Sequence, residues 1–292
     1  MKLTKLCVIA ACVPLCAQVV SEIRYKLSAG DLLSAEALGD DYYRAHGANS
    51  EYALALAWLA RGALTLQQPE IAGRYLAETR TITADLLKTK SVDEDDALAS
   101  AVGARIEVEA KLLEARGQHE KAVALLESEL PHWKRYSLRA RIQKNINLLT
   151  LVGKPAPELD AQYRGKPVLL FLWAHWCSDC KAQAPVIARI RQKYASRSLL
   201  VVAPTRLYGD VPKIEHPTEA QETARIEAVW KESYAGLNGL PHPISDATML
   251  AYGVSSTPTL VLIDTQGIVR MYEPFRMSDR ALSERIESML GQ

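Results

Sequence analysis

The sequence predicts an all-α N-terminal half followed by an α/β half built on a central sheet. Three observations carry this prediction. Segments rich in Ala, Leu, Glu and Arg succeed one another up to residue 150, and a Pro/Gly-rich joint follows at residues 152–157. Beyond the joint, apolar runs of strand length alternate with helical patterns, as in α/β domains. The 292 residues are enough for two domains.

The first residues have the pattern of a signal peptide. Two lysines precede an apolar run over residues 6–17, which is shorter than the ~20 residues that a membrane-spanning helix needs. We place cleavage after Ala17, with Ser21 as a second site. A lipoprotein-like box that ends at Cys12 and a buried N-terminal helix are the two alternatives. The chain is therefore predicted to be exported, to the bacterial periplasm or cell envelope.

Removal of residues 1–17 reduces the odd number of cysteines to a single pair. The chain contains five cysteines, and three of them lie in this predicted leader. The remaining two, Cys177 and Cys180, form a C-x-x-C pair. One close pair in an oxidising compartment differs from the many bridges of a small disulfide-stapled scaffold.

Residues 18–150 are predicted to form a helical-hairpin domain. Residues 110–122 resemble the helix–turn–helix of tetratricopeptide repeats, and a weak self-similarity recurs at an offset of about 50 residues. The domain is therefore expected to be TPR-like and to bind a protein partner, or to pack on the second domain as a simple bundle. Ser91 and Glu94 fit a capping box. The expected helices are 31–46, 50–67, 70–88, 93–116 and 120–129.

Residues 151–292 are predicted to form the α/β domain. It begins with the continuous apolar run Val168–Trp173, which suits a strand covered on both faces. Thr218 and Gln221 fit a capping box at the start of a later helix. The elements expected after the first strand are a helix at 178–194, a strand at 199–203, a helix at 218–234, a short helix after Asp246, a hairpin of 259–263 with 268–272, and a helix at 278–290.

The C-x-x-C pair is the strongest chemical signal. Cys177 follows a strand and a short turn and is placed at a helix N-terminus, where free N–H groups and the helix dipole stabilise a thiolate. Cys180 lies one turn along the helix, close enough to form a disulfide. Cys177 is thus the predicted nucleophile and Cys180 its resolving partner. The alternatives are a structural staple worth about 2 kcal/mol and a zinc site, for which further ligands at suitable spacing are missing.

The residues around this pair resemble those of a known protein family. The run Trp-Ala-His-Trp-Cys-Ser-Asp-Cys-Lys at 173–181, with Pro185 behind it, resembles the thioredoxin superfamily, and the resemblance extends over residues 151–292. Gly153-Lys-Pro-Ala-Pro157, the Gly-Lys-Pro before the first strand and the long insert are similar to exported TlpA-like thiol–disulfide oxidoreductases of the redoxin group. The resemblance implies a thioredoxin-like fold, with a central mixed sheet flanked by helices.

The resemblance also implies a substrate-binding surface. Residues 253–259 resemble the family's cis-proline loop, which faces the C-x-x-C pair. Pro258 would then be cis, and the backbone of Thr257 would pair with an extended substrate segment as an added strand. Trp176, beside the first cysteine, is expected to contribute to the same surface.

Three departures from the family pattern concern acid–base chemistry. Phe171 stands where thioredoxin has a buried Asp, and Gln183 stands where cytochrome-c-maturation reductases carry a Glu. A maturation-reductase function is therefore less favoured. Between the cysteines, Ser178-Asp179 stands where thioredoxin has Gly-Pro. Asp179 repels a neighbouring thiolate, whereas His175 and Lys181 attract it. We expect these three residues to modulate the pair, with Asp179 as a hypothetical proton acceptor.

The predicted function is a thiol–disulfide oxidoreductase, in the direction of reduction of protein disulfides. Its predicted partners are protein thiols and disulfides, an upstream electron donor or acceptor protein and a partner of the helical half, which would select the substrate. No metal and no cofactor beyond the redox-active disulfide is expected. With 35 basic and 34 acidic side chains, the near-neutral charge excludes a strong electrostatic case for nucleic acid or an anionic membrane.

Two other functions remain as alternatives. The first is a peroxiredoxin-like thiol peroxidase of the redoxin/AhpC-TSA group. Phe171, Ala174 and His175 replace the pattern that such peroxidases use to bind peroxide. The second is a helical interaction module in which the cysteine pair is secondary.

Overall fold

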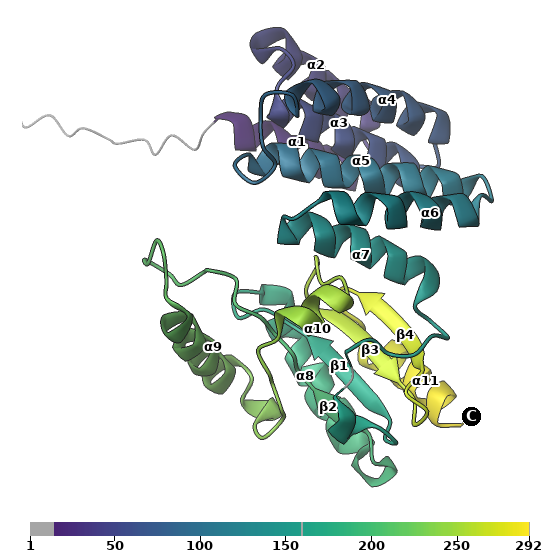
Figure 1. Cartoon of the computed structure of the whole chain (residues 1–292), viewed down its shortest axis with the longest axis vertical. Helices are drawn as coiled ribbons and strands as arrows, with labels where there is room; N and C mark the ends of the chain where they lie inside the picture. The colour runs from purple at the N-terminus through teal and green to yellow at the C-terminus, as the bar shows by residue number, and fades with distance from the viewer. Residues whose placement is uncertain (1–14, 159, 292) are drawn as a thin grey trace, which may run out of the picture. The chain divides into compact units, whose positions relative to one another are not determined.

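The computed structural model describes residues 15–158 and 160–291, and the chain divides into two compact units between Ala122 and Val123 (Figure 1). Most of the predicted leader, including Cys12 of the lipoprotein-like box, lies outside the described residues. None of the helices in the described part of the chain is long and apolar enough to cross a membrane.

The first unit is entirely helical in its described part. Its most enclosed helix is α3 (Ser50–Thr65), which contacts four other helices and buries most of its surface. Small side chains allow this close packing, because Gly39 lies against Leu59 and a side chain at Gly62 would overlap Leu27. The other helices are α1 (Leu15–Ser28), α2 (Leu32–His46), α4 (Pro69–Leu86) and α5 (Asp96–Ala115), and α6 (His119–Glu129) crosses the division between the units.

Helix α7 (Tyr136–Thr150) belongs with the second unit. The predicted division after residue 150 had placed this segment in the helical half. The buried Asn147 side chain donates a hydrogen bond to the Ala251 carbonyl at 3.0 Å. Gly253, with a φ of +60°, approaches the α7 backbone so closely that a Cβ would overlap Lys144. These contacts attach α7 to the α/β part of the chain.

The second unit is built on a four-stranded mixed sheet in the order β2-β1-β3-β4. Strand β1 runs parallel to β2 and antiparallel to β3, and β4 runs antiparallel to β3. A helix therefore connects β1 to β2 by a crossover, whereas β3 and β4 form a hairpin. The strands are β1 (Val168–Leu172), β2 (Leu200–Val202), β3 (Thr259–Ile263) and β4 (Val269–Pro274).

Helices cover both faces of this sheet, which explains the unbroken apolar run of β1. Leu169 and Phe171 point into a core with α8 (Ser178–Lys193), α9 (Glu219–Ser233) and α11 (Asp279–Leu290). Leu170 and its alternate neighbours point to the opposite core, with α10 (Asp246–Ala251). Strands alternate their side chains between faces, so every position of β1 is buried. The central mixed sheet flanked by helices, which the resemblance implied, is confirmed.

The backbone at each edge of the sheet also has partners. Beyond β2, the N–H groups of Ala203 and Thr205 donate to the carbonyls of Pro241 and Pro243 at 2.8 and 2.9 Å. At the other edge, Gly153 donates to the Val269 carbonyl at 2.8 Å. Segments without regular structure thus flank both edge strands.

Candidate active site

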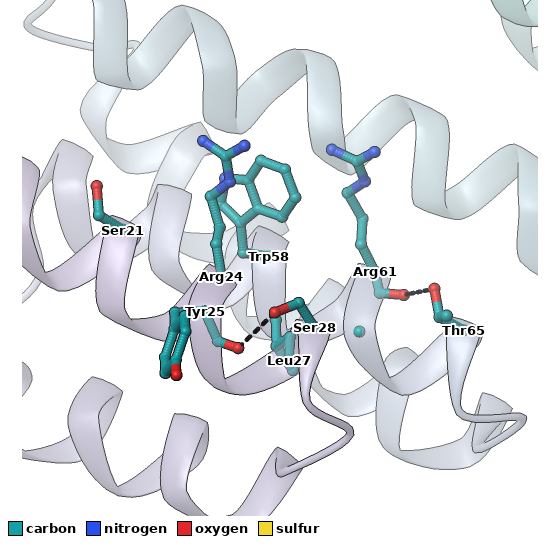
Figure 2. A pocket seen from close by; sticks show the side chains of 9 residues that line it. Ser21, Arg24, Tyr25, Leu27, Ser28, Trp58, Arg61 and Thr65 are labelled. Carbon is teal, nitrogen blue, oxygen red and sulfur yellow. Dashed lines mark hydrogen bonds between the residues drawn. The ribbon is translucent and has the colours of Figure 1, made fainter. Parts of the chain in front are cut away.

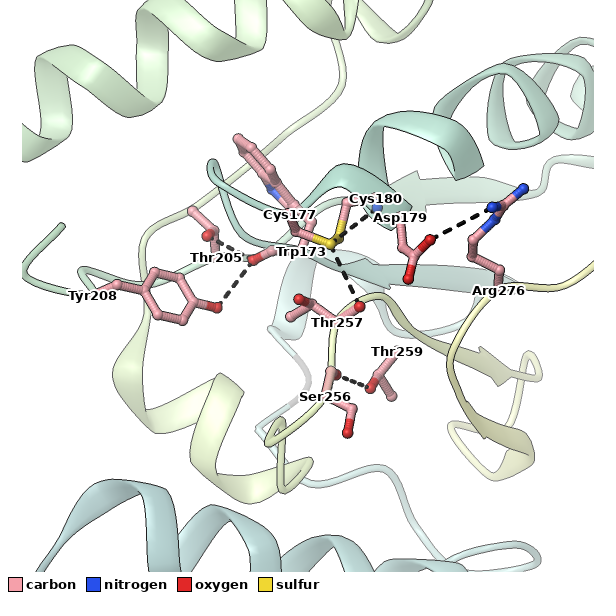
Figure 3. The surroundings of a disulfide bond; sticks show 10 residues. All are labelled: Trp173, Cys177, Asp179, Cys180, Thr205, Tyr208, Ser256, Thr257, Thr259 and Arg276. Carbon is pink, nitrogen blue, oxygen red and sulfur yellow. Dashed lines mark hydrogen bonds and ion pairs between the residues drawn. A yellow bond between two sulfur atoms is a disulfide. The ribbon is translucent and has the colours of Figure 1, made fainter. Parts of the chain in front are cut away.

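Cys177 and Cys180 form a disulfide at the N-terminus of α8 (Figure 3). Their Cα atoms are 5.3 Å apart. Cys177 is the N-cap residue, and its Sγ accepts a hydrogen bond from the Cys180 N–H at 3.0 Å. The same Sγ lies 3.4 Å from the Thr257 carbonyl oxygen. Both cysteines are buried, and Cys177 is the more exposed of the two at 4%.

The segment between β1 and α8 is fixed by hydrogen bonds to the chain that follows β2. The backbone N–H of Trp173 donates to the Pro204 carbonyl at 3.2 Å, and its indole N–H donates to the Ala203 carbonyl at 2.8 Å. The Thr205 hydroxyl in turn donates to the Trp173 carbonyl at 2.8 Å. This clamp places Cys177 where the first N–H groups of α8 point at its sulfur, and such groups stabilise a thiolate.

The loop before β3 faces the disulfide, and the Thr257–Pro258 peptide bond is cis, as the resemblance implied. The Thr259 hydroxyl donates to the Ser256 carbonyl at 2.8 Å, and the Phe275 N–H donates to the Pro258 carbonyl at 2.7 Å. The structure thus brings Thr257 and Pro258 to the sulfur atoms that the sequence predicted as reactive.

Trp176 lies at the rim of this site with 52% of its surface exposed. Its ring meets the edge of Tyr208 at a centroid distance of 5.3 Å. The Tyr208 hydroxyl donates to the Trp173 carbonyl at 3.3 Å (Figure 3). Sequence reasoning missed Tyr208, although an aromatic residue in the long insert after β2 was a usable signal.

Arg206 connects this rim to α7. Its guanidinium lies 3.8 Å from the Tyr136 ring centroid and 4.4 Å from that of Tyr208. Burial raises the pKa of Tyr136 to about 12 and also raises the pKa of Tyr208. Both phenols are therefore neutral at working pH, and the contacts are cation–π interactions rather than ion pairs.

His175, one of the three predicted modulators, is held by contacts with the insert after β2. It is buried, and its Nε2 lies 2.7 Å from the Asp210 carbonyl, which it contacts as a hydrogen-bond donor. Its Nδ1 lies 3.9 Å from Oε1 of the buried Glu222. Glu222 accepts hydrogen bonds from the N–H groups of Tyr208 and Gly209 at 2.6 and 2.8 Å. These contacts tie His175 to the insert, because its ring turns toward residues 208–222.

The two other predicted modulators are exposed. Oδ1 of Asp179 lies 3.5 Å from Nη1 of Arg276, and Figure 3 shows this pair beside the disulfide. Arg276, in the segment after β4, was not predicted from the sequence. Lys181 is an exposed residue of the first turns of α8. Two cations and one anion therefore lie on the solvent side of the site.

The interior positions of the acid–base residues are uncharged in this chain. Gln183 is buried, and its Oε1 accepts a hydrogen bond from the Met277 N–H at 3.0 Å. Phe171 lies in the core with its ring centroid 6.3 Å from that of Tyr234. Within the described part of the chain, no three His, Cys, Asp or Glu side chains are grouped to hold a metal ion.

Comparisons place this half of the chain among known proteins, although no family model matches it. The chain is 25% identical over 146 residues to the thioredoxin-like protein YneN of Bacillus subtilis, covering 49% of this chain and 75% of YneN. It is 28% identical over 131 residues to the thiol–disulfide oxidoreductase ResA of Geobacillus thermodenitrificans, covering 44% and 65%. It is 31% identical over 140 residues to the thiol:disulfide interchange protein DsbE of Pseudomonas aeruginosa, covering 41% and 64%.

A solved structure is similar over the same extent. A thiol:disulfide interchange protein from Chlorobium tepidum is 18% identical with a TM-score of 0.38, and the match covers 48% of this chain and 97% of that one. The chain spans about two thirds to three quarters of the curated relatives it matches. These relatives cover about half of the chain, and the Cys177–Cys180 pair lies in that half.

Proposed function

We propose that this chain reduces disulfides of exported proteins through Cys177 and Cys180, because the half of the chain that contains this pair has homologues among the thiol–disulfide oxidoreductases. One observation carries the proposal. Sγ of Cys177 is at the N-terminus of α8, within 3.4 Å of the Thr257 carbonyl, and its disulfide partner is one turn away. The nucleophile, its resolving group and a strip of backbone for the substrate therefore share one surface.

The exchange begins with the reduced pair. The Cys177 thiolate attacks one sulfur of the substrate disulfide, the substrate S–S bond breaks, and the other substrate sulfur leaves as a thiolate that takes up a proton. Deprotonated Cys180 then attacks Sγ of the mixed disulfide. The second substrate thiolate leaves and is protonated, and the Cys177–Cys180 disulfide forms. Two electrons have passed to the substrate, and a dithiol protein upstream must restore the reduced pair.

The surroundings of the disulfide supply recognition. An extended substrate segment would pair with the Thr257 backbone beside cis-Pro258 and contact the exposed ring of Trp176. The electron pair resides on the two sulfur atoms, so the exchange needs no bound cofactor. We further propose that residues 18–150 select the partner, which is the role that a TPR-like domain would perform.

Trapping of the intermediate tests this function. In a Cys180→Ser variant the second attack is lost, so mixed disulfides through Cys177 should accumulate in the exporting host and dissolve on addition of a reductant. Non-reducing gels and mass spectrometry of the captured partners measure this. The matched control is Cys177→Ser, which removes the nucleophile and should capture nothing. An empty Cys180→Ser trap in a folded protein contradicts the exchange mechanism.

A further inference from the structure

A groove of about 610 Å³ lies between α1 and α3 in the first unit, far along the chain from the cysteines. Its lining includes the side chains of Arg24, Leu27, Trp58 and Arg61 (Figure 2). Tyr25 stands at its border with 73% of its surface exposed. We call this surface the Arg24–Arg61 groove. Its size is within the range of binding pockets for small ligands or a few peptide side chains.

Two positively charged side chains of the groove contact the same aromatic ring. The guanidinium carbons of Arg24 and Arg61 lie 4.5 and 4.4 Å from the centroid of the Trp58 ring. Figure 2 shows the two arginine side chains running the same way, with Trp58 between them in this view. None of the described residues that line the groove is acidic. Residues 15–122 as a whole carry 12 basic and 17 acidic side chains, so the groove is a local cationic site in an acidic unit.

Contacts behind the groove fix Arg61. Its Nε lies 3.5 Å from Oε1 of Glu107, a buried residue of α5 that also contacts the Lys111 ammonium at 3.1 Å. The groove floor is equally fixed, because a side chain at Gly62 would overlap Leu27. A cation held in place before binding loses less conformational freedom when a ligand arrives.

Two hydroxyl groups of the lining are bound to carbonyls of their own helices. The Ser28 hydroxyl donates to the Tyr25 carbonyl at 2.7 Å, and the Thr65 hydroxyl donates to the Arg61 carbonyl at 3.1 Å (Figure 2). The lining also contains the guanidinium groups of Arg24 and Arg61, of which Arg61 contacts Glu107 through its Nε. Guanidinium groups match the planar geometry of a carboxylate.

We propose that the Arg24–Arg61 groove binds an acidic peptide segment of a partner protein. A carboxylate side chain lies against the two arginines, and a neighbouring apolar side chain packs on Trp58 and Tyr25. The exposed aromatic surface favours a peptide over a simple anion, because an apolar neighbour gains from burial there. This proposal does not depend on the redox function.

Binding of a defined probe to the full chain tests the proposal. The probe is a fluorescein-labelled peptide with an Asp-Phe-Glu core and blocked ends, and its matched control carries Asn and Gln in place of Asp and Glu. Fluorescence anisotropy should show saturable binding of the acidic peptide that weakens as salt rises. The amide peptide should bind at least about tenfold more weakly, since hydrogen bonds to charged groups are the stronger ones.

Single substitutions show where on the protein the peptide binds. Arg24→Gln should weaken binding about tenfold or more, because it removes one charged donor, and Arg24 is exposed so the fold is retained. Arg61→Gln should act in the same direction. The matched control is Arg44→Gln, which removes the same charge from an exposed arginine of α2 and should leave binding unchanged. Absence of binding at millimolar peptide, equal binding of the amide peptide, full competition by inorganic phosphate, or equal losses with Arg44→Gln overturns the proposal.

Discussion

Asp179 and Arg276 face each other across the solvent side of the disulfide, 3.5 Å apart between Oδ1 and Nη1. Both side chains are more than half exposed. Each therefore acts on the Cys177 sulfur through solvent, and the effect of either charge alone is small. Their opposite signs make the two residues a matched pair of probes.

Substitution of Asp179 and substitution of Arg276 should shift the pH midpoint of Cys177 alkylation in opposite directions. Asp179→Asn removes a negative charge beside the thiolate, so the pH midpoint of alkylation by iodoacetamide should fall, by less than about one pH unit. Arg276→Gln removes a positive charge and should raise that midpoint by a similar amount. Both shifts should shrink in 1 M salt, as expected with a Debye length of about 3 Å.

Turnover measured on the same variants tests the acid–base hypothesis separately. If Asp179 accepts a proton during exchange, Asp179→Asn should lower turnover even where alkylation becomes faster. If Asp179→Asn changes neither the alkylation profile nor turnover, Asp179 has no modulating role.

Sequence reasoning at the residue scale worked where chemistry is local. The C-x-x-C spacing at a helix start predicted the Cys177–Cys180 contact, and the motif before β3 implied the cis bond at Pro258. The closeness of His175 to Cys177 in the chain did not reveal that its ring turns toward the Asp210 carbonyl. Arg276 could not be found in this way, because it follows β4 and reaches Asp179 only through the fold.

At the scale of elements, the insert after β2 is held on three sides. Tyr136 of α7 contacts Arg206, Glu222 of α9 accepts the N–H groups of Tyr208 and Gly209, and Tyr208 meets Trp176. Residues 206–209 of the insert are therefore held in place beside Trp176, at the rim of the active site. Their rigidity depends on Arg206, whose cation joins α7 to Tyr208.

Arg206→Met should make residues 206–209 of the insert more mobile without unfolding the second unit. Loss of two cation–π contacts is expected to lower the free energy of unfolding by about 1–3 kcal/mol, measured by urea denaturation. When residues 206–209 are more mobile, KM for a protein disulfide should rise more than kcat falls. Iodide should also quench the fluorescence of Trp176 more strongly. Arg206→Lys should restore part of the effect. The same change at the exposed Arg189 of α8 is the control, and equal KM effects there would contradict a role for Arg206.

Helix starts show what an element's sequence specifies. Thr218 and Gln221 form the predicted capping box of α9. The box predicted at Ser91 and Glu94 is wrong, because α5 begins later, with Asp95 as its N-cap residue. Asp95 accepts hydrogen bonds from the Leu98 N–H and from the Ser50 hydroxyl of α3. The second of these contacts is tertiary, and a capping pattern read along the chain contains no information about it.

At the scale of the whole molecule, the position of α7 decides where a redox fragment can be cut. The helix contacts α10 and β4, and Asn147 and Gly253 fix it to the chain that leads into the cis-proline loop. Sequence patterns predicted the sheet, its order of elements and its buried strands. They did not predict the attachment of α7, since an amphipathic helix before a Pro/Gly joint suits either neighbour.

Two fragments test this attachment. Residues 123–292 should unfold in a single cooperative transition, because they contain α7 with its contacts. Residues 151–292 lack these contacts and also lack Tyr136, which packs against the core that contains Tyr252, so their unfolding free energy should be lower by several kcal/mol, on the order of two buried side chains. Denaturant unfolding of both fragments measures the difference. Equal stabilities would show that α7 is dispensable for the second unit.

The prolines beside β2 have a consequence for behaviour in a crowded compartment. An edge strand with free N–H and C=O groups is a template on which another chain can add, which leads to aggregation. Here the carbonyls of Pro241 and Pro243 accept the N–H groups of Ala203 and Thr205, so the backbone beyond β2 already has partners within the chain. A segment without regular strand structure therefore covers this edge of the sheet, which is one way in which native sheets avoid edge-to-edge pairing. Under the proposed function, the surface beside Cys177 that receives substrate segments is thus separate from a sheet edge that is already covered.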